Sequence, residues 1–210
     1  DDFESLNKSD LVFIMVPTPF DRNTNLSDDS AIIDTLTKLE KIKYNSKKPV
    51  IIKSTVAPGS CQRYSNKFNL NIVFNPEFLR ESISPFEDFE KQNTVVLGTL
   101  DKLSFETVRS AYQKVLNGEE DYFQTSYVTA EMIKMSQNAT LATRVAIANL
   151  IYDACLDSGA NYTDVKKIAF DRFDILGPHM VQVPGPDGKR GFGGKCLPKD
   201  ISAFNSLYSS

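Results

Sequence analysis

A glycine-rich stretch near the carboxyl end of the 210-residue chain carries the residues best suited to covalent chemistry. Residues 191–200 read Gly-Phe-Gly-Gly-Lys-Cys-Leu-Pro-Lys-Asp, so Cys196 stands between two lysines and Asp200 follows closely. Glycines let the backbone approach a ligand, and cationic neighbours favour the thiolate that acts as a nucleophile. We interpret Cys196 as a catalytic nucleophile, although the stretch taken alone would also suit a buried, inert cysteine.

A second candidate pair, Lys134 and Asn138, lies on a helix expected over residues 128–155. This region lacks glycine and proline and has apolar residues at helical spacing, which predicts a long, mostly buried helix that connects domains or forms an oligomer interface. Residues four apart share a helix face, so the pair could donate hydrogen bonds to an oxyanion beside the thiol. The alternative is a helix ion pair between Glu131 and Lys134 with a snorkelling lysine.

Further candidates follow the apolar strands of the first half. Glu77 and Glu81 are four apart after one such strand and could place a water molecule and exchange protons. A solvated helix start, where acids are favoured, explains them as well. Ser54 and Thr55 follow another strand and could be only a helix cap.

Other polar residues give weaker signals. His179 is the single histidine, and a cysteine and histidine pair would suggest a thiol hydrolase, but no local signature of such an enzyme is present. Lys189 and Arg190 precede the glycine loop and could bind phosphate, although a solvated turn explains them equally well.

The elements that position these residues alternate between strand and helix. Four apolar runs predict buried strands, at residues 11–16, 50–56, 71–74 and 94–98. Helical patterns and short polar connections separate most of them, which predicts an α/β fold with a parallel sheet covered by helices. Ligands bind at the carboxyl ends of such strands, where Pro17, Thr18, Ser54, Thr55 and Glu77 fall.

Composition narrows the class of protein. The formal net charge is −3 and no basic run occurs, so neither nucleic acid nor an anionic membrane is an expected partner. Three widely spaced cysteines argue against a disulfide framework and for a reducing compartment, by default the cytoplasm. No apolar run approaches the roughly 20 residues of a membrane span, and the start lacks the order of a signal peptide.

Five motifs in order resemble those of the nucleotide-sugar 6-dehydrogenases. They are Val-Pro-Thr-Pro at 16–19, Lys-Ser-Thr-Val at 53–56, Asn-Pro-Glu-Phe-Leu-Arg-Glu at 75–81, Ala-Glu-Met-Ile-Lys at 130–134 with Asn138, and the cysteine loop at 191–200. Residues 183–188, Val-Pro-Gly-Pro-Asp-Gly, resemble the UDP-glucose branch of that family in particular.

The resemblance implies oxidation of a sugar C6 alcohol to a carboxylate in two steps, with NAD as cofactor and UDP-glucose as the expected substrate. Cys196 would attack the intermediate aldehyde and carry a thiohemiacetal and then a thioester. Lys134 and Asn138 would stabilise the oxyanion, Glu77 would position water or move protons, and Asp200 would orient the lysine and water. The cofactor would contact Pro17, Thr18, Ser54, Thr55 and Glu81, and the sugar nucleotide would contact Phe78, Leu79, Arg190, Phe192 and Gly193. No metal is implied.

The resemblance also implies a domain arrangement. Residues 1–127 would form the second half of a Rossmann-like NAD-binding sheet, without the GxGxxG turn, and residues 128–210 a central helical domain with the cysteine loop. The long helix would mediate a homodimer. We therefore expect the middle of a longer enzyme; the rival interpretation, a non-catalytic remnant or interaction module of the same family, predicts an unreactive Cys196.

Overall fold

The computed structural model describes residues 3–21, 26–78, 85–170 and 172, which divide between two compact units, Asp1–Thr140 and Leu141–Ser210. In chain order the helices are η1 (Phe3–Lys8, a 3-10 helix), α1 (Ser30–Lys41), α2 (Ser60–Lys67), α3 (Pro85–Glu90), α4 (Lys102–Tyr112), α5 (Tyr127–Ser158) and α6 (Tyr162–Ala169). The strands are β1 (Val12–Ile14), β2 (Phe20–Asp21), β3 (Leu26–Ser27), β4 (Pro49–Ile52), β5 (Asn71–Phe74), β6 (Thr94–Gly98) and β7 (Asp121–Thr125).

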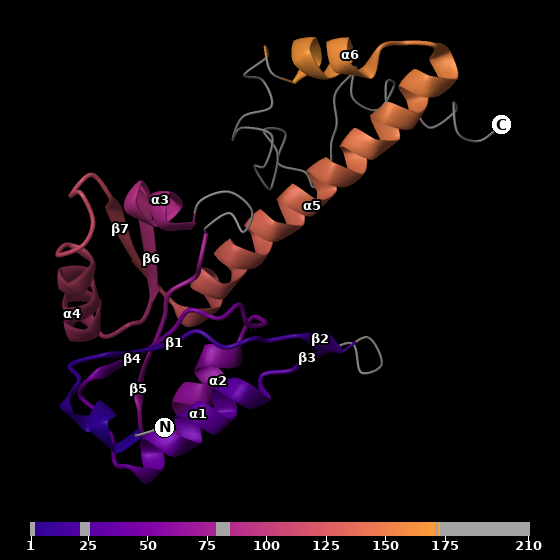
Figure 1. The fold of residues 1–210 in the computed structure, drawn as a ribbon. Coiled ribbons are helices and arrows are strands. Elements are labelled where there is room, and N and C mark those ends of the chain that lie inside the picture. Colours follow the sequence, from indigo (N-terminus) through magenta and orange to yellow (C-terminus); the bar gives the residue numbers. More distant parts are fainter. Residues whose placement is uncertain (1–2, 22–25, 79–84, 171, 173–210) are drawn as a thin grey trace, which may run out of the picture. The chain divides into compact units, whose positions relative to one another are not determined.

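The first unit is built on a five-stranded sheet with the order β1-β4-β5-β6-β7, shown in Figure 1. The pairs β1–β4, β4–β5 and β6–β7 are parallel. The α/β fold predicted from the sequence is confirmed, but the expectation of a wholly parallel sheet is wrong, because β5 and β6 pair antiparallel through Phe74 and Gly98. A short antiparallel hairpin, β2–β3, follows β1.

The reversal between β5 and β6 has a cause in the chain that joins them. A parallel strand after β5 would need a crossover that carries the chain back to the amino end of the sheet. Instead, the six-residue helix α3 stays near the carboxyl end of β5. Phe89 of α3 lies with its ring centroid 6.1 Å from that of Tyr112, and the Tyr112 hydroxyl bonds Asn75, the residue after β5. The chain therefore enters β6 from the carboxyl side.

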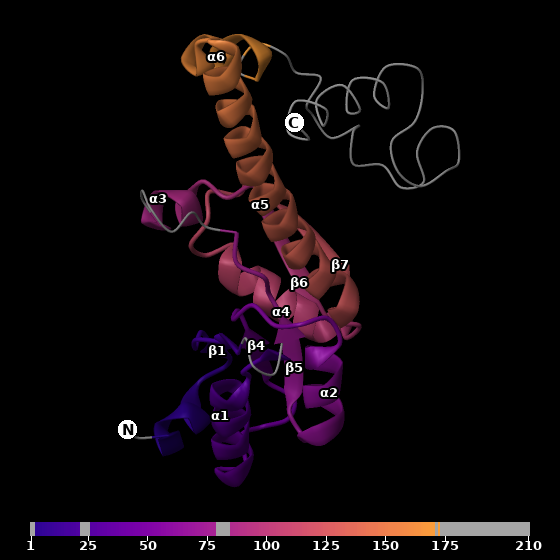
Figure 2. The same cartoon turned by 90° about the vertical axis from the view of Figure 1, so that its right-hand side faces the viewer.

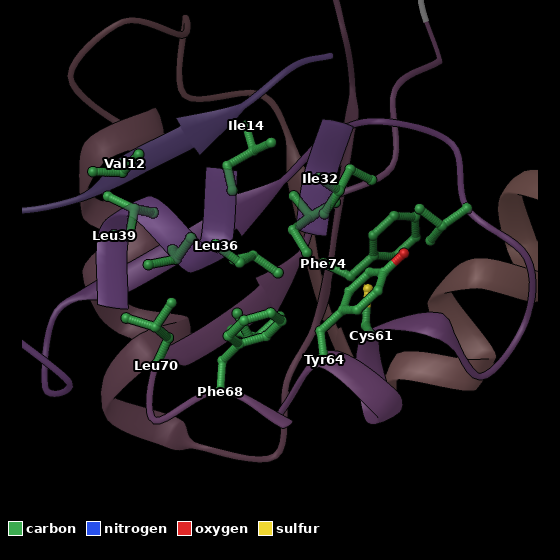
Figure 3. Packing of buried hydrophobic residues seen from close by; sticks show 14 of the residues in the cluster. Val12, Ile14, Ile32, Leu36, Leu39, Cys61, Tyr64, Phe68, Leu70 and Phe74 are labelled. Atoms are coloured by element: carbon green, nitrogen blue, oxygen red, sulfur yellow. The ribbon is translucent and has the colours of Figure 1, made fainter. Parts of the chain in front are cut away.

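One face of the sheet packs against α1 and α2. Alternate strand residues such as Val12 and Ile14 point to this face and meet Leu36 and Leu39 of α1 in a buried cluster (Figure 3). Tyr64 and Cys61 of α2 complete it, together with Ala130 at the start of α5. Alternation places successive strand residues on opposite faces, so the same strands supply two cores.

The other face packs against α4. Phe13 and Ile51 lie on this face, and the strand residues meet Phe105, Val108 and Tyr112 of α4. The amphipathic pattern of α4 therefore fixes its position, and its last residue, Tyr112, reaches the carboxyl ends of β4 and β5 through its bonds with Lys53 and Asn75.

Helix α5 is uninterrupted over the region where the sequence predicts a long helix (Figure 2). The expectation that it is mostly buried is wrong for this single chain. Its large exposed apolar residues are Val128, Met132, Met135, Ile147, Leu150, Tyr152 and Leu156. Within its first turns, Ala130 and Glu131 are the fully buried residues.

In the second unit the chain turns at Gly159, which has a φ of 73° that only glycine adopts readily. Helix α6 follows, capped by the Asn161 side chain, which accepts from the N–H groups of Thr163 and Asp164. The rings of Tyr152 and Tyr162 meet edge to face at 5.2 Å and hold α6 beside the end of α5.

Candidate functional site

Several predicted site residues lie outside the described part of the chain. They are Leu79, Glu81, Arg190, Phe192, Gly193, Cys196 and Asp200. The remaining candidates, Pro17, Thr18, Ser54, Thr55, Glu77, Phe78, Lys134 and Asn138, are all described. The site is therefore built here from the second group.

The loops after β1 and β4 are joined by side-chain hydroxyls. Ser54 Oγ accepts from the N–H of Val16 at 2.9 Å and donates to the carbonyl of Val16 at 2.7 Å. Thr18 Oγ1 donates to the carbonyl of Thr55 at 2.7 Å. These contacts continue the parallel pairing beyond the last residues of both strands, so Ser54 has a structural task in this chain that sequence reasoning did not identify.

A polar cluster lies at the carboxyl ends of β4 and β5. Lys53 Nζ donates to Asn75 Oδ1 at 3.0 Å and to the Tyr112 hydroxyl at 3.2 Å. It also forms an ion pair with Glu77 Oε2 at 3.2 Å. The side chains of Lys53 and Glu77 are 10% and 33% exposed, respectively, so the pair is largely shielded from water on its lysine side.

Backbone groups of the sheet hold Asn75 in place. Its side-chain amide donates to the carbonyl of Val96 at 2.9 Å, and its backbone N–H donates to the carbonyl of Ile52 at 2.9 Å. Tyr112 donates its hydroxyl to Asn75 Oδ1, and burial raises the pKa of Tyr112, which keeps that hydroxyl protonated. Asn75 is thus fixed to the sheet, and its hydrogen bond with Lys53 restrains Nζ of that lysine.

Lys134 approaches the same cluster from α5. Its Nζ lies 5.6 Å from the ring centroid of Phe78, a cation–π contact. Burial lowers the pKa of Lys134, and the charge of Lys53 adds to this effect, whereas the negative charge of Glu77 opposes it. Glu77 is therefore within electrostatic reach of two lysines.

Glu131 does not pair with Lys134 in this structure. Its carboxylate is fully buried and accepts the N–H groups of Gly59 and Cys61 at the start of α2. The alternative of a Glu131–Lys134 ion pair is therefore wrong, because the carboxylate of Glu131 is hydrogen-bonded to the start of α2.

Asn138, which lies one turn after Lys134 on α5, is exposed.

An apolar cavity opens beside the Lys53–Glu77 pair. It has a volume of about 460 Å³. Lys53, Glu77 and Tyr112 line it together with the apolar residues Phe13, Met15, Phe86, Phe89, Ala111 and Val115. A concave, mostly apolar space with a few converging polar groups is the usual form of a small-molecule site.

Sequence reasoning singled out Glu77 and Lys134, which lie in this region, but it did not identify Lys53, Asn75 and Tyr112 as a group. A signal for Lys53 existed, because it is a lone cation directly after the apolar run at 50–52. No pattern in the sequence links it to Tyr112, which is 59 residues away and meets it only through the reversed strand order.

The neighbouring parallel strands β1 and β4 end side by side at one edge of the sheet. The carboxyl ends of the neighbouring parallel strands β1 and β4 are held side by side by the Ser54 and Thr18 contacts, and Pro17 is exposed at that rim. Dinucleotides bind across such strand ends in doubly wound sheets.

Among the described residues, no group of acidic, cysteine or histidine side chains is arranged to hold a metal ion. The described part of the chain also has no helix with the length and apolar character that a membrane span requires.

Comparison with known proteins places these features in a family. Residues 1–116 match the NAD binding domain of the UDP-glucose/GDP-mannose dehydrogenase family, and residues 128–210 match the central domain of that family. The UDP-glucose 6-dehydrogenase of Rickettsia felis is 35% identical over 208 residues, which cover 96% of this chain and 44% of that protein.

Solved structures agree. A ternary complex of GDP-mannose dehydrogenase from Pseudomonas aeruginosa is 28% identical, with a TM-score of 0.82 over 99% of this chain and 49% of that one. A UDP-glucose dehydrogenase from Pyrobaculum islandicum is 27% identical, with a TM-score of 0.72 over 98% of this chain and 48% of that one. The chain thus spans less than half the length of these relatives. The family resemblance and NAD as the cofactor of the matched domain are confirmed, and the chain belongs to the UDP-glucose/GDP-mannose dehydrogenase family.

Proposed function

We propose that this chain is part of an NAD-dependent enzyme that oxidises the C6 alcohol of a nucleotide sugar to a carboxylate, with UDP-glucose as substrate. The observation that carries the proposal is the placement of Glu77 at a strand end beside an apolar cavity, within reach of Lys53 and Lys134. The relatives named UDP-glucose 6-dehydrogenase support the choice of sugar.

NAD, when bound, accepts a hydride in each of the two oxidations. Pro17, Thr18, Ser54, Thr55 and Glu81 are the residues we expect to hold it. The exposure of Pro17 and the fixed loops after β1 and β4 support this role for the first four. The sugar nucleotide would be held by Phe78, Leu79, Arg190, Phe192 and Gly193.

After the first oxidation, the Cys196 thiolate would attack the aldehyde carbon and form a carbon–sulfur bond. Lys134 and Asn138 would donate to the resulting oxyanion. The partly buried amine of Lys134 suits this task, because a donor in a shielded position stabilises a developing charge more strongly than one in water. Loss of the second hydride would convert the thiohemiacetal to a thioester.

Hydrolysis would complete the reaction. Glu77 would accept a proton from a water molecule that Asp200 orients, and the oxygen of this water would attack the thioester carbon. The carbon–sulfur bond would then break, which releases the carboxylate and returns the Cys196 thiolate. A reducing compartment such as the cytoplasm would keep this thiol free.

The experiment that tests the proposal measures NADH formation from UDP-glucose and NAD. It compares the chain with a version extended at both ends to the length of its relatives. Two variants of the extended protein, Cys196→Ser and the matched control Cys155→Ala, are measured as well. We expect two NADH per UDP-glucose oxidised from the extended protein and from the control. Cys196→Ser should abolish the reaction or stop it after the first hydride.

The proposal fails if the extended protein oxidises no UDP-glucose, or if Cys196→Ser is as active as the parent. Oxidation of GDP-mannose or UDP-N-acetylmannosamine in place of UDP-glucose would correct the substrate alone. An unreactive Cys196 with no response to NAD would favour a non-catalytic module of the family.

The domain limits and the oligomer also belong to this proposal. We place the boundary between the cofactor domain and the central domain at residues 127–128, where the second family match begins. The exposed apolar residues of α5, such as Met132 at 47% and Leu150 at 37%, support a homodimer formed along this helix. Analytical ultracentrifugation should give twice the mass of one chain. The Met132→Glu variant should have a measured mass closer to that of one chain.

A further inference from the structure

The polar cluster contains a lysine to which the reaction scheme above assigns no task. Hydrogen bonds restrain both the backbone and the side chain of Lys53. Its N–H donates to the carbonyl of Ile14 at 3.0 Å, and its Nζ has Asn75 and Tyr112 as fixed partners. A lysine side chain with its ammonium group so restrained has lost most of its rotamer freedom.

The partners of Lys53 are themselves rigid. Asn75 is 2% exposed and is tied to the backbone of two strands through Val96 and Ile52. The ring of Tyr112 packs edge to face on Phe13 with centroids 6.3 Å apart. The ammonium group of Lys53 is thus placed by the sheet core rather than by the flexible length of its own side chain.

Glu77 differs from Lys53 in these respects. It lies after β5 in a loop, its side chain is a third exposed, and it borders the cavity. A fixed charge beside such a carboxylate favours the conformations that bring the two groups together. The Lys53 ammonium group, 3.2 Å from Oε2, is a fixed charge of this kind.

We propose that Lys53 is a positioning residue that fixes the carboxylate of Glu77 toward the cavity, with Asn75 and Tyr112 holding the lysine in place. The inference rests on the proposed function, in which Glu77 handles water and protons. Oε2 of the carboxylate lies 3.2 Å from Nζ of Lys53, so this contact restrains the carboxylate at the border of the cavity.

The first test uses the chain itself and NMR couplings of the Glu77 side chain. In the parent these couplings should show one rotamer, and in Lys53→Met, which keeps the length but removes the charge, they should show averaging. Tyr112→Phe keeps the packed ring and removes one support of the lysine, so it should loosen Glu77 without endangering the fold. Lys38→Met is the matched control, because Lys38 pairs with Asp34 at 2.7 Å on α1, across the sheet.

The second test is a double-mutant cycle on kcat in the extended protein with Lys53→Met and Glu77→Gln. Misplacing a catalytic group by about 1 Å lowers the reaction rate on the order of a hundredfold. Lys53→Met should therefore lower kcat by roughly ten- to a hundredfold with little change in KM. In the Glu77→Gln background the same change should alter kcat less than about twofold, since Lys53 acts through Glu77. A purely structural lysine would reduce activity equally in both backgrounds.

The two tests separate the claims. If Glu77 keeps a single rotamer in both Lys53→Met and Tyr112→Phe, the positioning role is overturned whatever the activity. Equal losses of kcat in the two backgrounds overturn it as well. If the couplings average as expected but the extended protein oxidises no nucleotide sugar, the proposed function fails and the contact between Lys53 and Glu77 stands as found.

Discussion

The backbone N–H of Cys61 donates to Oε1 of Glu131 over 2.8 Å, although the two residues are 70 positions apart. Glu131 also accepts from Gly59, so one carboxylate satisfies two of the N–H groups at the start of α2. The contact ties the first turns of α5, which carry Lys134, to the start of α2. The negative charge of the Glu131 carboxylate is favourable at the amino end of α2, where the helix dipole is positive.

Glu131→Ala should destabilise the protein by about 2–4 kcal/mol, because two buried N–H groups lose their acceptor. Urea unfolding followed by circular dichroism measures this loss. Labelling of the buried Cys61 thiol should also become faster, as α2 opens more often. Glu106→Ala is the control, since Glu106 is partly exposed and pairs with Arg109 within α4, and it should change the free energy of unfolding by less than about 0.5 kcal/mol. Equal effects of the two changes would contradict the anchoring role.

Ser54→Ala tests the connection between the loops after β1 and β4. The substitution removes both hydrogen bonds to Val16, and we expect a loss of about 1–2 kcal/mol. Hydrogen exchange of the Val16 amide should become faster by roughly tenfold or more, since the N–H loses its acceptor. Unchanged protection of that amide would show that the loop is held by other contacts.

Lys134 should titrate below the ordinary lysine value of 10.5, because burial lowers its pKa. NMR of reductively methylated lysines, assigned with Lys134→Arg, measures the midpoint. Glu77→Gln should lower the midpoint further, since the carboxylate favours the charged amine, whereas Asp34→Asn on α1 should leave it unchanged. A midpoint that rises in Glu77→Gln would contradict the described geometry.

The same shift has a consequence for stability. Between the folded-state pKa and 10.5, the unfolded chain binds a proton at Lys134 that the folded chain does not. The free energy of unfolding contributed by this group therefore rises with pH through that window. Urea unfolding of the parent and of Lys134→Met at several pH values isolates this contribution: the free energy of unfolding of the parent minus that of the variant should rise with pH through the window.

Gly98→Ala should destabilise the sheet unit. A Cβ atom at this position would lie 2.9 Å from Cβ of Ala130 and 3.3 Å from Cβ of Phe74, and Ala130 is fully buried. Overpacking of this kind costs about 1–3 kcal/mol. Because the closest atom belongs to Ala130, Gly98→Ala with Ala130→Gly should lose less stability than the sum of the two single changes. Additive losses would show that the clash is relieved elsewhere.

The sequence predicts the regular elements where one strong pattern dominates. The strands at 71–74 and 94–98 have the predicted bounds, and the long helix at 127–158 contains the predicted region. The strand β7 was not predicted, because it is an edge strand with only two adjacent aromatic residues among polar ones and no buried residue. The reversed direction of β6 could not be predicted, since an apolar strand of this length suits either direction.

Some residues of the candidate site were singled out from the sequence, and the roles expected for them stay predictions. Glu77 and Lys134 stood out because charged residues at a strand end or on an apolar helix need a reason. Lys53 and Tyr112 have ordinary explanations when taken singly, as a solvated strand end and an amphipathic helix residue. Their meeting depends on where α4 ends, which is a property of the sheet topology.

The reversal between β5 and β6 also changes the electrostatic character of the site. In a wholly parallel α/β sheet, the helices on both faces point their amino ends, with partial positive charge, toward the carboxyl ends of the strands. Helix α4 instead brings its carboxyl end there, with Tyr112 as its last residue. The partial negative charge of that end favours a cation, and Lys53 is the cation beside it. The topology thus makes this corner of the sheet suited to an ammonium group, and through that group to a carboxylate.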